Sequence, residues 1–188
     1  MKKIVSFILI GFILSVGNVF AERGDKKEFR QGHKQDRKAF WSTKRAENKE
    51  FRKEVKALPE GERASAVVQH REGQYTEAKE FREKMHGENM AFLQDKLAKN
   101  QKLTDAQKTD LIEFMEKQHQ ENISFRDQQH AESMAFFEQI ANDSNLTQEQ
   151  KKEAIQKHWQ DQKTENKTYR KEQHSEYKDY KDLLKTPE

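Results

Sequence analysis

Aromatic residues recur at intervals of 11 positions along most of the chain. The phenylalanines beyond the N-terminal segment form two ladders with this spacing, offset from each other, and Tyr169 and Tyr180 continue the second ladder. Eleven residues complete three turns at about 3.67 residues per turn, close to the natural helical value. The rings therefore stay on one face of a nearly straight helix, and the pattern predicts an all-α fold. The ladders contain Phe29, Phe40, Phe51, Phe81, Phe92, Phe114, Phe125 and Phe136.

Polar residues have fixed places in the same repeat. A basic residue or a histidine lies six positions before the ring and an acid lies four before it, as in 86–92 and 119–125. Along 111–140, apolar and polar residues alternate on the face that carries the rings. This face is narrower than the apolar face of a packed bundle helix. We therefore expect a thin core and a homodimer, because long helices with little to bury gain stability from a second copy.

Three similar segments predict where helices begin. Two of them read Leu-Thr-x-x-Gln, in which threonine caps the helix and glutamine bonds back to the cap backbone. In the third, Leu58-Pro59, proline suits an opening turn. We expect four helices at 25–57, 61–99, 105–141 and 148–184, forming hairpins or an elongated bundle of four units of about 44 residues. The capping residues are Leu103, Thr104, Gln107, Leu146, Thr147 and Gln150.

Two glycines lie inside the second predicted helix. Gly73 and Gly87 should each weaken that helix by about 1 kcal/mol relative to alanine. We therefore expect the second helix to bend or split at these positions.

The segment from Met1 to Ala21 differs from the rest of the chain. Lys2 and Lys3 precede an apolar run over 4–16, and Val19-Phe20-Ala21 ends the segment. This is the layout of a secretory signal peptide, so we predict cleavage after Ala21 and a single exported all-helical domain over 22–188. No later stretch approaches the ~20 apolar residues that cross a bilayer. We expect a periplasmic protein without a membrane span.

Composition narrows the functional classes. The chain has 188 residues, no cysteine, 32% hydrophobic residues and 36 basic against 33 acidic side chains. Losing Lys2 and Lys3 with the first segment lowers the net charge from +3 to +1, which leaves no basic surplus to attract nucleic acid. The sequence has no glycine-rich phosphate loop, no His-Glu-x-x-His and no nucleophile elbow. We expect neither an enzyme nor a nucleic-acid-binding protein.

Histidines make metal binding an alternative. Glu83-x-x-His86, Glu116-x-x-His119 and Asp127-x-x-His130 each place an acid and a histidine on one helical face. Facing Glu-x-x-His pairs hold di-iron centres in helical bundles, and histidines between helices can bind zinc or copper weakly. The 11-residue repeat also explains why histidine recurs, so no tightly bound cofactor is expected. The candidate ligands are His86, His119 and His130.

The rings of the repeat have two interpretations. They can form the interface between antiparallel helices, or they can line an exposed amphipathic surface that binds apolar segments of other proteins. In the second case, charges between the rings would keep the apolar contact shallow and reversible. The candidate client-binding residues are Phe81, Met85, Phe92, Phe114, Ile123, Phe125, Met134 and Phe136.

The Leu-Thr-x-x-Gln segments at 103–107 and 146–150 resemble those of the LTxxQ-motif proteins of the bacterial periplasm, the Spy/CpxP family. The matching stretches are 103–118 and 146–152. The resemblance implies a small all-helical protein that dimerises into a curved cradle and acts without ATP as a chaperone or an envelope-stress modulator; some relatives bind metal. The short spacing between the two segments and the aromatic ladder depart from the family pattern, so an array of four equal helices is an alternative to the cradle.

The leading hypothesis is therefore an exported, ATP-independent chaperone or envelope-stress protein that binds unfolded or partly folded clients. A structural or spacer protein without a client surface is the first alternative. A periplasmic metal-binding or metal-sensing protein is the second.

Overall fold

Four long helices make up the part of the chain that the structure describes. The structure is a computed structural model, and it describes residues 23–183. The helices are α2 (Arg23–Ala57), α3 (Glu60–Ala98), α4 (Asp105–Asn142) and α5 (Gln148–Leu183). The prediction of an all-α fold with four helices is confirmed, and the helix boundaries agree closely with the expected ones. The predicted signal peptide lies outside the described residues.

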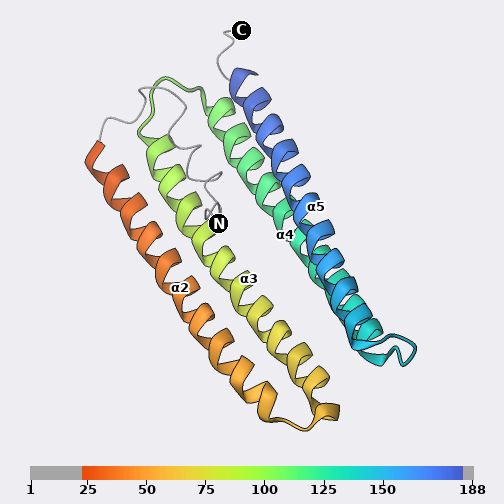
Figure 1. The fold of residues 1–188 in the computed structure, drawn as a ribbon. Coiled ribbons are helices and arrows are strands. Elements are labelled where there is room, and N and C mark those ends of the chain that lie inside the picture. The colour runs from red at the N-terminus through yellow and green to blue at the C-terminus, as the bar shows by residue number, and fades with distance from the viewer. Residues whose placement is uncertain (1–22, 184–188) are drawn as a thin grey trace.

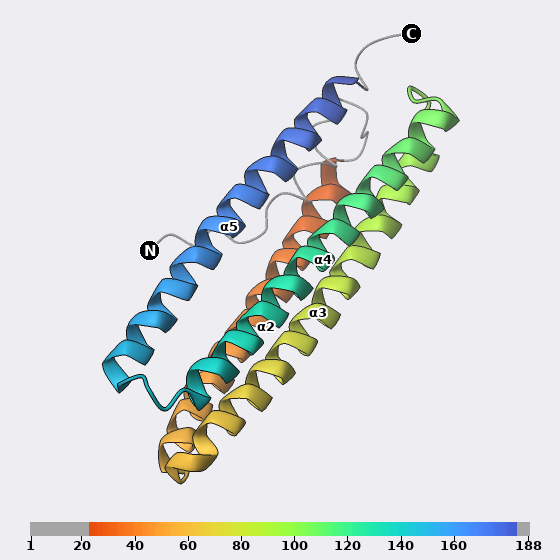
Figure 2. The same cartoon turned by 90° about the vertical axis from the view of Figure 1, so that its right-hand side faces the viewer.

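The helices lie side by side in chain order, each antiparallel to the next (Figure 1). They do not form a flat layer. Figure 2 shows α2 and α5 toward one side and α3 and α4 toward the other, so the layer is bent. Residues from all four helices consequently line one hollow on the concave side.

Side chains fix where α4 and α5 begin. Thr104 Oγ1 accepts a hydrogen bond from the backbone N–H of Gln107 at 3.2 Å, and Gln107 Oε1 accepts one from the N–H of Thr104 at 3.0 Å. Thr147 and Gln150 form the same reciprocal pair at 3.2 and 2.8 Å. Both predicted capping boxes form and satisfy N–H groups that a helix leaves unpaired at its start.

The start of α3 uses the backbone instead. Pro59 occupies the cap position, its side chain makes no capping hydrogen bond, and its carbonyl accepts from the N–H of Glu62 at 3.0 Å. Of the two outcomes expected at Gly73 and Gly87, a bend or a split, the split does not occur, because α3 is continuous from Glu60 to Ala98. Stacking contacts on both sides of the helix, described below, outweigh the weak helical preference of two glycines.

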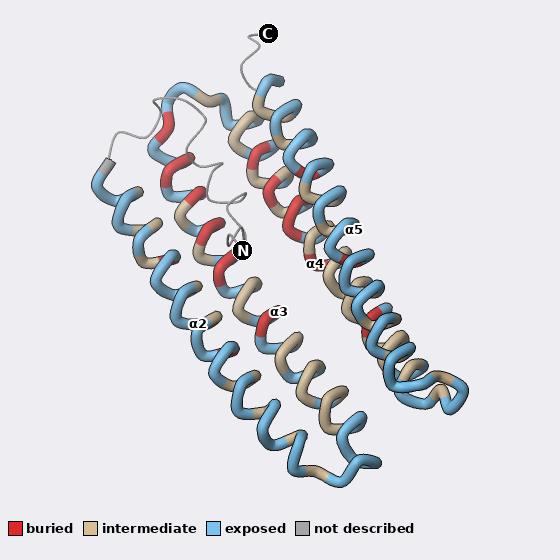
Figure 3. Tube along the Cα trace, viewed as in Figure 1, coloured by how far each residue is buried: buried red, intermediate tan, exposed pale blue. Residues whose placement is uncertain are grey.

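The buried residues concentrate on the two middle helices (Figure 3). The main apolar cluster lies near the α3–α4 connection, where Leu93 and Leu111 are almost fully enclosed. Met90, Leu97 and Met115 complete it. Within residues 23–183, none of the helices contains a sufficient apolar stretch to span a bilayer.

Candidate functional site

Rings of the 11-residue repeat meet in stacked pairs between adjacent helices. The ring centroids of these pairs are 3.7 to 4.3 Å apart, and the ring planes lie within 10° of parallel. Aromatic pairs of this kind contribute about 0.5–1.5 kcal/mol beyond the area they bury. Three pairs join α2 to α3 and three join α4 to α5. They are Phe29–Phe92, Phe40–Phe81 and Phe51–His70, then Phe114–Tyr180, Phe125–Tyr169 and Phe136–His158.

Polar contacts flank the stacked pairs. An acid four positions before a ring contacts the side chain four positions after the partner ring on the neighbouring helix. These contacts place the acids at the exposed edges of the interfaces, where most of their partners are buried side chains. The contacts are Asp25–Lys96 (3.1 Å), Glu88–His33 (3.1 Å) and Glu77–Lys44, then Glu176–Gln118 (2.8 Å), Glu121–Gln173 (2.9 Å) and Glu165–Gln129 (3.1 Å).

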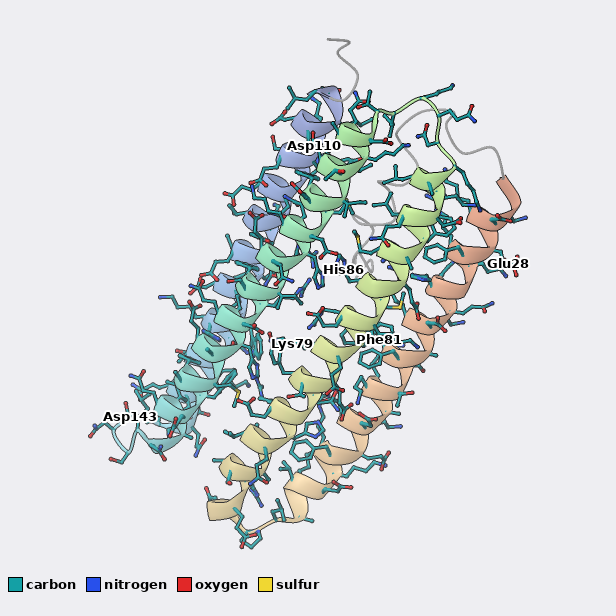
Figure 4. All side chains as sticks on the ribbon, turned by 180° about the vertical axis from the view of Figure 1, so that it is seen from behind. Glu28, Lys79, Phe81, His86, Asp110 and Asp143 are labelled. Carbon is teal, nitrogen blue, oxygen red and sulfur yellow. The ribbon has the colours of Figure 1, made fainter. Side chains whose placement is uncertain are left out.

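A second row of rings joins α3 to α4. His86 stacks on His119 with centroids 3.6 Å apart. Nε2 of His86 lies 3.0 Å from a carboxylate oxygen of Glu116, and Nε2 of His119 lies 2.9 Å from one of Glu83. Figure 4 shows His86 on the side of α3 toward α4 and Phe81 on the side toward α2. Each middle helix therefore presents one ring row to each neighbour.

The same arrangement recurs one repeat away along both middle helices. Tyr75 stacks on His130 at 3.8 Å, and Nε2 of His130 lies 3.0 Å from a carboxylate oxygen of Glu72. The hydroxyl of Tyr75 donates to Asp127, which also accepts from Nζ of Lys79 at 2.9 Å. These two hydrogen bonds hold the pKa of Asp127 below its ordinary value. Burial and the bond to Asp127 raise the pKa of Tyr75 well above its ordinary value.

The hairpin α2–α3 and the hairpin α4–α5 have the same pattern of stacked rings. The difference in residue number between corresponding rings is constant from α2 to α4, and it has a second constant value from α3 to α5. The same offsets give the positions on α5 and α2 that correspond to the α3–α4 ring row. These positions carry cations or histidine instead of the stacked rings. The positions that correspond to the acids beside those rings carry no carboxylate. The ring positions become Lys34, Arg45, Lys163 and His174, and the acid positions become Gln31, Ser42, Gln160 and Lys171.

This substitution distinguishes the outer helices from the middle ones. The stacked pairs place 34–45 of α2 at about the height of 163–174 of α5, so Lys34 and Arg45 on one edge of the bent layer lie at heights similar to those of Lys163 and His174 on the other. Like charges at short range repel, and neither helix supplies carboxylates from these positions to neutralise the other. The α2 and α5 edges therefore lack the paired rings and carboxylates that form the α3–α4 interface.

A groove of about 890 Å³ lies on the concave side. All four helices line it, and Trp41 of α2 and Trp159 of α5 contribute indole rings. Within the described chain its lining contains eight Lys or Arg side chains and no Asp or Glu. Acids and bases are nearly equal in number in the whole sequence, so this surface is strongly segregated in charge. The cations are Lys34, Arg37, Lys38, Lys44, Arg45, Arg71, Arg82 and Arg126.

Burial perturbs the arginines of the groove. Desolvation lowers the pKa of Arg82 to about 10, with a further decrease caused by the nearby charge of Arg126. Desolvation also lowers the pKa of Arg126, and Arg170 of α5 adds to that effect. The guanidinium of Arg71 lies 3.9 Å from the ring centroid of Phe137 and 5.1 Å from that of Trp159. These cation–π contacts fix Arg71 against the α4–α5 wall.

The structure distributes the predicted client-binding residues over the helix interfaces. The five predicted phenylalanines all lie in the stacked pairs, and Met85 and Ile123 are buried. Met134 is the member of the set that lines the groove. Of the predicted metal ligands, His86 and His119 meet each other, whereas His130 pairs with Tyr75. Among residues 23–183, no three or more histidines and acids gather in a geometry suited to a metal ion.

The groove residues carry little signal in the sequence. Runs of charge on long helices resemble ordinary solvated faces, so Arg82 and Arg126 do not stand out from the other cations. One signal was present: Lys38, Arg82, Arg126 and Arg170 follow each other at a constant spacing of four repeats. This spacing puts one cation on each helix.

The chain matches no protein-family model, no curated protein and no solved structure.

Proposed function

We propose that the protein is an ATP-independent binding protein that holds unfolded or partly folded clients in its concave groove. The observation that carries this proposal is the groove itself, about 890 Å³ in volume and lined by eight cations and no acid among the described residues. A binding role accounts for this segregation of charge in a chain whose acids and bases nearly balance. The function is binding rather than catalysis.

The groove combines two kinds of contact. Trp41, Trp159 and Met134 offer apolar surface, and the aliphatic stems of lysine and arginine extend it. The charged ends of those side chains favour segments rich in aspartate and glutamate. Clients with exposed apolar and acidic residues therefore fit this surface better than basic clients do.

The mechanism follows from this combination. Positive potential in a concave surface speeds the encounter with an acidic chain, and flexible side chains adapt to many sequences. The groove is open along its length between α2 and α5, so a client can leave without a lid movement or ATP hydrolysis. Release would follow as the client folds and buries its apolar residues.

We also propose that the protein is exported to the periplasm and forms a homodimer. Export to the periplasm, after removal of residues 1–21, would place the groove where misfolded envelope proteins occur. The homodimer expected from the thin core is compatible with an open groove but is not needed to form it. Sedimentation equilibrium of the purified protein tests the dimer directly.

Aggregation suppression tests the function. Purified protein is added without ATP to a denatured acidic protein, or to a denatured basic protein of similar size, as each is diluted into buffer. We expect near-stoichiometric suppression of light scattering for the acidic client and less suppression for the basic one. Suppression for the acidic client should weaken at 1 M salt, because the electrostatic screening length falls from about 10 Å at 0.1 M to about 3 Å at 1 M. No suppression at large excess would instead favour the spacer alternative.

A matched pair of variants locates the surface. Lys34→Glu with Arg45→Glu reverses two charges that line the groove. Lys49→Glu with Lys157→Glu makes an equal change of net charge at exposed positions outside it. The groove variant should lose most of the suppression and the control variant should retain it; equal losses would show that only net charge matters.

A further inference from the structure

One cation from each helix lies at about the same height across the groove. Lys38, Arg82, Arg126 and Arg170 are spaced by four repeats each, and the stacked pairs between neighbouring helices align these positions to within a turn. The first three line the groove. Arg82 on α3 and Arg126 on α4 form the floor, because these are the two middle helices.

Arg82 and Arg126 lack anionic partners. Among the described residues neither side chain has a hydrogen bond or an ion pair, and Nη1 of Arg82 is enclosed without any acceptor. The nearest candidate carboxylate, Asp127, is already held by Tyr75 and Lys79. The two guanidiniums are near enough for the charge of Arg126 to lower the pKa of Arg82, both side chains are partly buried, and neither uses its donors within the described residues.

Such an arrangement is costly unless an anion completes it. A partly buried charge without a counter-ion loses part of its hydration without an ion pair to replace it, and a second cation beside it adds repulsion. Guanidinium groups present paired N–H donors whose geometry matches the two oxygens of a carboxylate or a phosphate. An oxyanion between the two arginines would satisfy the enclosed donor and remove the repulsion.

We propose that Arg82 and Arg126 form an oxyanion-binding site on the floor of the groove, which takes one carboxylate or phosphate group of the ligand that occupies the groove. Lys38 flanks the pair from the α2 side and Arg170 from the α5 side. This inference rests on the proposed function only in assigning the carboxylate to an acidic client. The site itself requires only the two arginines.

Inorganic phosphate serves as the first probe. The unfolding temperature of the protein is measured in sodium phosphate and in sodium chloride at the same pH and ionic strength, for the unaltered chain, Arg82→Gln, Arg126→Gln and Arg45→Gln. The last variant removes an equal charge from an exposed position in the groove. Phosphate should raise the unfolding temperature of the unaltered chain and of Arg45→Gln, because a ligand that binds only the folded state stabilises it.

Arg82→Gln and Arg126→Gln should change the unfolding temperature in chloride and should also abolish its increase in phosphate. In chloride they should unfold at a higher temperature than the unaltered chain, because one of two partly buried, mutually repelling charges is gone. In phosphate the extra stabilisation should be absent. Arg82→Lys, which keeps the charge but not the paired donors, should show an intermediate phosphate effect. Equal phosphate effects in all four proteins would overturn the site.

A labelled peptide of alternating glutamate and leucine separates the site from the proposed function. Its dissociation constant, measured by fluorescence anisotropy, should weaken about tenfold or more in Arg82→Gln, as expected for loss of a charged hydrogen-bonding partner. Arg45→Gln should show a smaller loss. Unchanged peptide binding in Arg82→Gln would overturn the anchor and leave groove binding standing. Phosphate stabilisation without peptide binding to the unaltered chain would keep the site and contradict the client function.

Discussion

Replacing Phe125 with alanine distinguishes a structural role of the aromatic ladder from a client-binding role. Phe125 is half-buried and stacks on Tyr169 with the ring centroids 4.0 Å apart. Truncating a fully buried phenylalanine costs about 3–5 kcal/mol, so half-burial reduces this to about 1.5–2.5 kcal/mol. The stack adds about 0.5–1.5 kcal/mol. We expect Phe125→Ala to lower the free energy of unfolding by about 2–4 kcal/mol.

Urea denaturation followed by far-ultraviolet circular dichroism measures this quantity. A double-mutant cycle with Tyr169→Ala isolates the stacking contribution, which should appear as a coupling of about 1 kcal/mol. The cycle of Phe125→Ala with Phe40→Ala is the control, because these rings belong to different interfaces and their effects should add within about 0.5 kcal/mol.

Two results would refute this reasoning. Additive effects of Phe125→Ala and Tyr169→Ala would mean that the two rings do not stabilise each other. Loss of client binding by Phe125→Ala with an unchanged free energy of unfolding would place the ring on the client surface. The interface interpretation requires instead that stability changes and that the groove still binds.

Three further outcomes follow from single contacts. Thr104→Ala or Thr147→Ala should each lower the free energy of unfolding by about 1 kcal/mol in the same urea assay, since each removes a capping box. Hydrogen bonds lower the pKa of Asp127, so its ionised form stabilises the fold above its unfolded pKa of about 3.9, and this stabilisation is lost as the pH falls through the folded pKa. Asp127→Asn should therefore flatten the acid limb of a stability-against-pH curve, and an unaltered limb would show that Asp127 has no such role. Burial lowers the pKa of His33 despite Glu88 at 3.1 Å, so its neutral form stabilises the fold above about pH 6.5 and loses this effect as the pH falls through the folded pKa; His33→Asn should remove that decline.

The sequence predicts the helices well because their signals are local. The Thr-x-x-Gln segments place the starts of α4 and α5 directly, and the 11-residue spacing keeps the rings on one face over each whole helix. The acid four positions before each ring is also visible in the sequence. Its contact cannot be predicted from the sequence, because the pairing of Glu121 with Gln173 depends on the register of α5 against α4.

The sequence does not show which neighbouring helix each ring contacts. His86 and Phe92 occupy neighbouring places in one repeat, yet His86 stacks on α4 and Phe92 on α2. The spacing of five or six positions implies two faces but does not say which neighbour each face meets. The groove was hidden for a similar reason, because Arg82 and Arg126 become neighbours only when α3 and α4 pair.

The replacement of rings by cations on the outer helices accounts for the number of helices that pack side by side. Each interface between two helices uses its own pair of residue rows, so packing ends at a helix whose outward row carries no rings. Lys34 and Arg45 end the array at α2, and Lys163 and His174 end it at α5. A further hairpin with rings in both rows, inserted between α3 and α4, would lengthen the arc by repeating the kinds of interface already present. Such an insertion would widen the groove by one hairpin while keeping the residue rows at both edges unchanged.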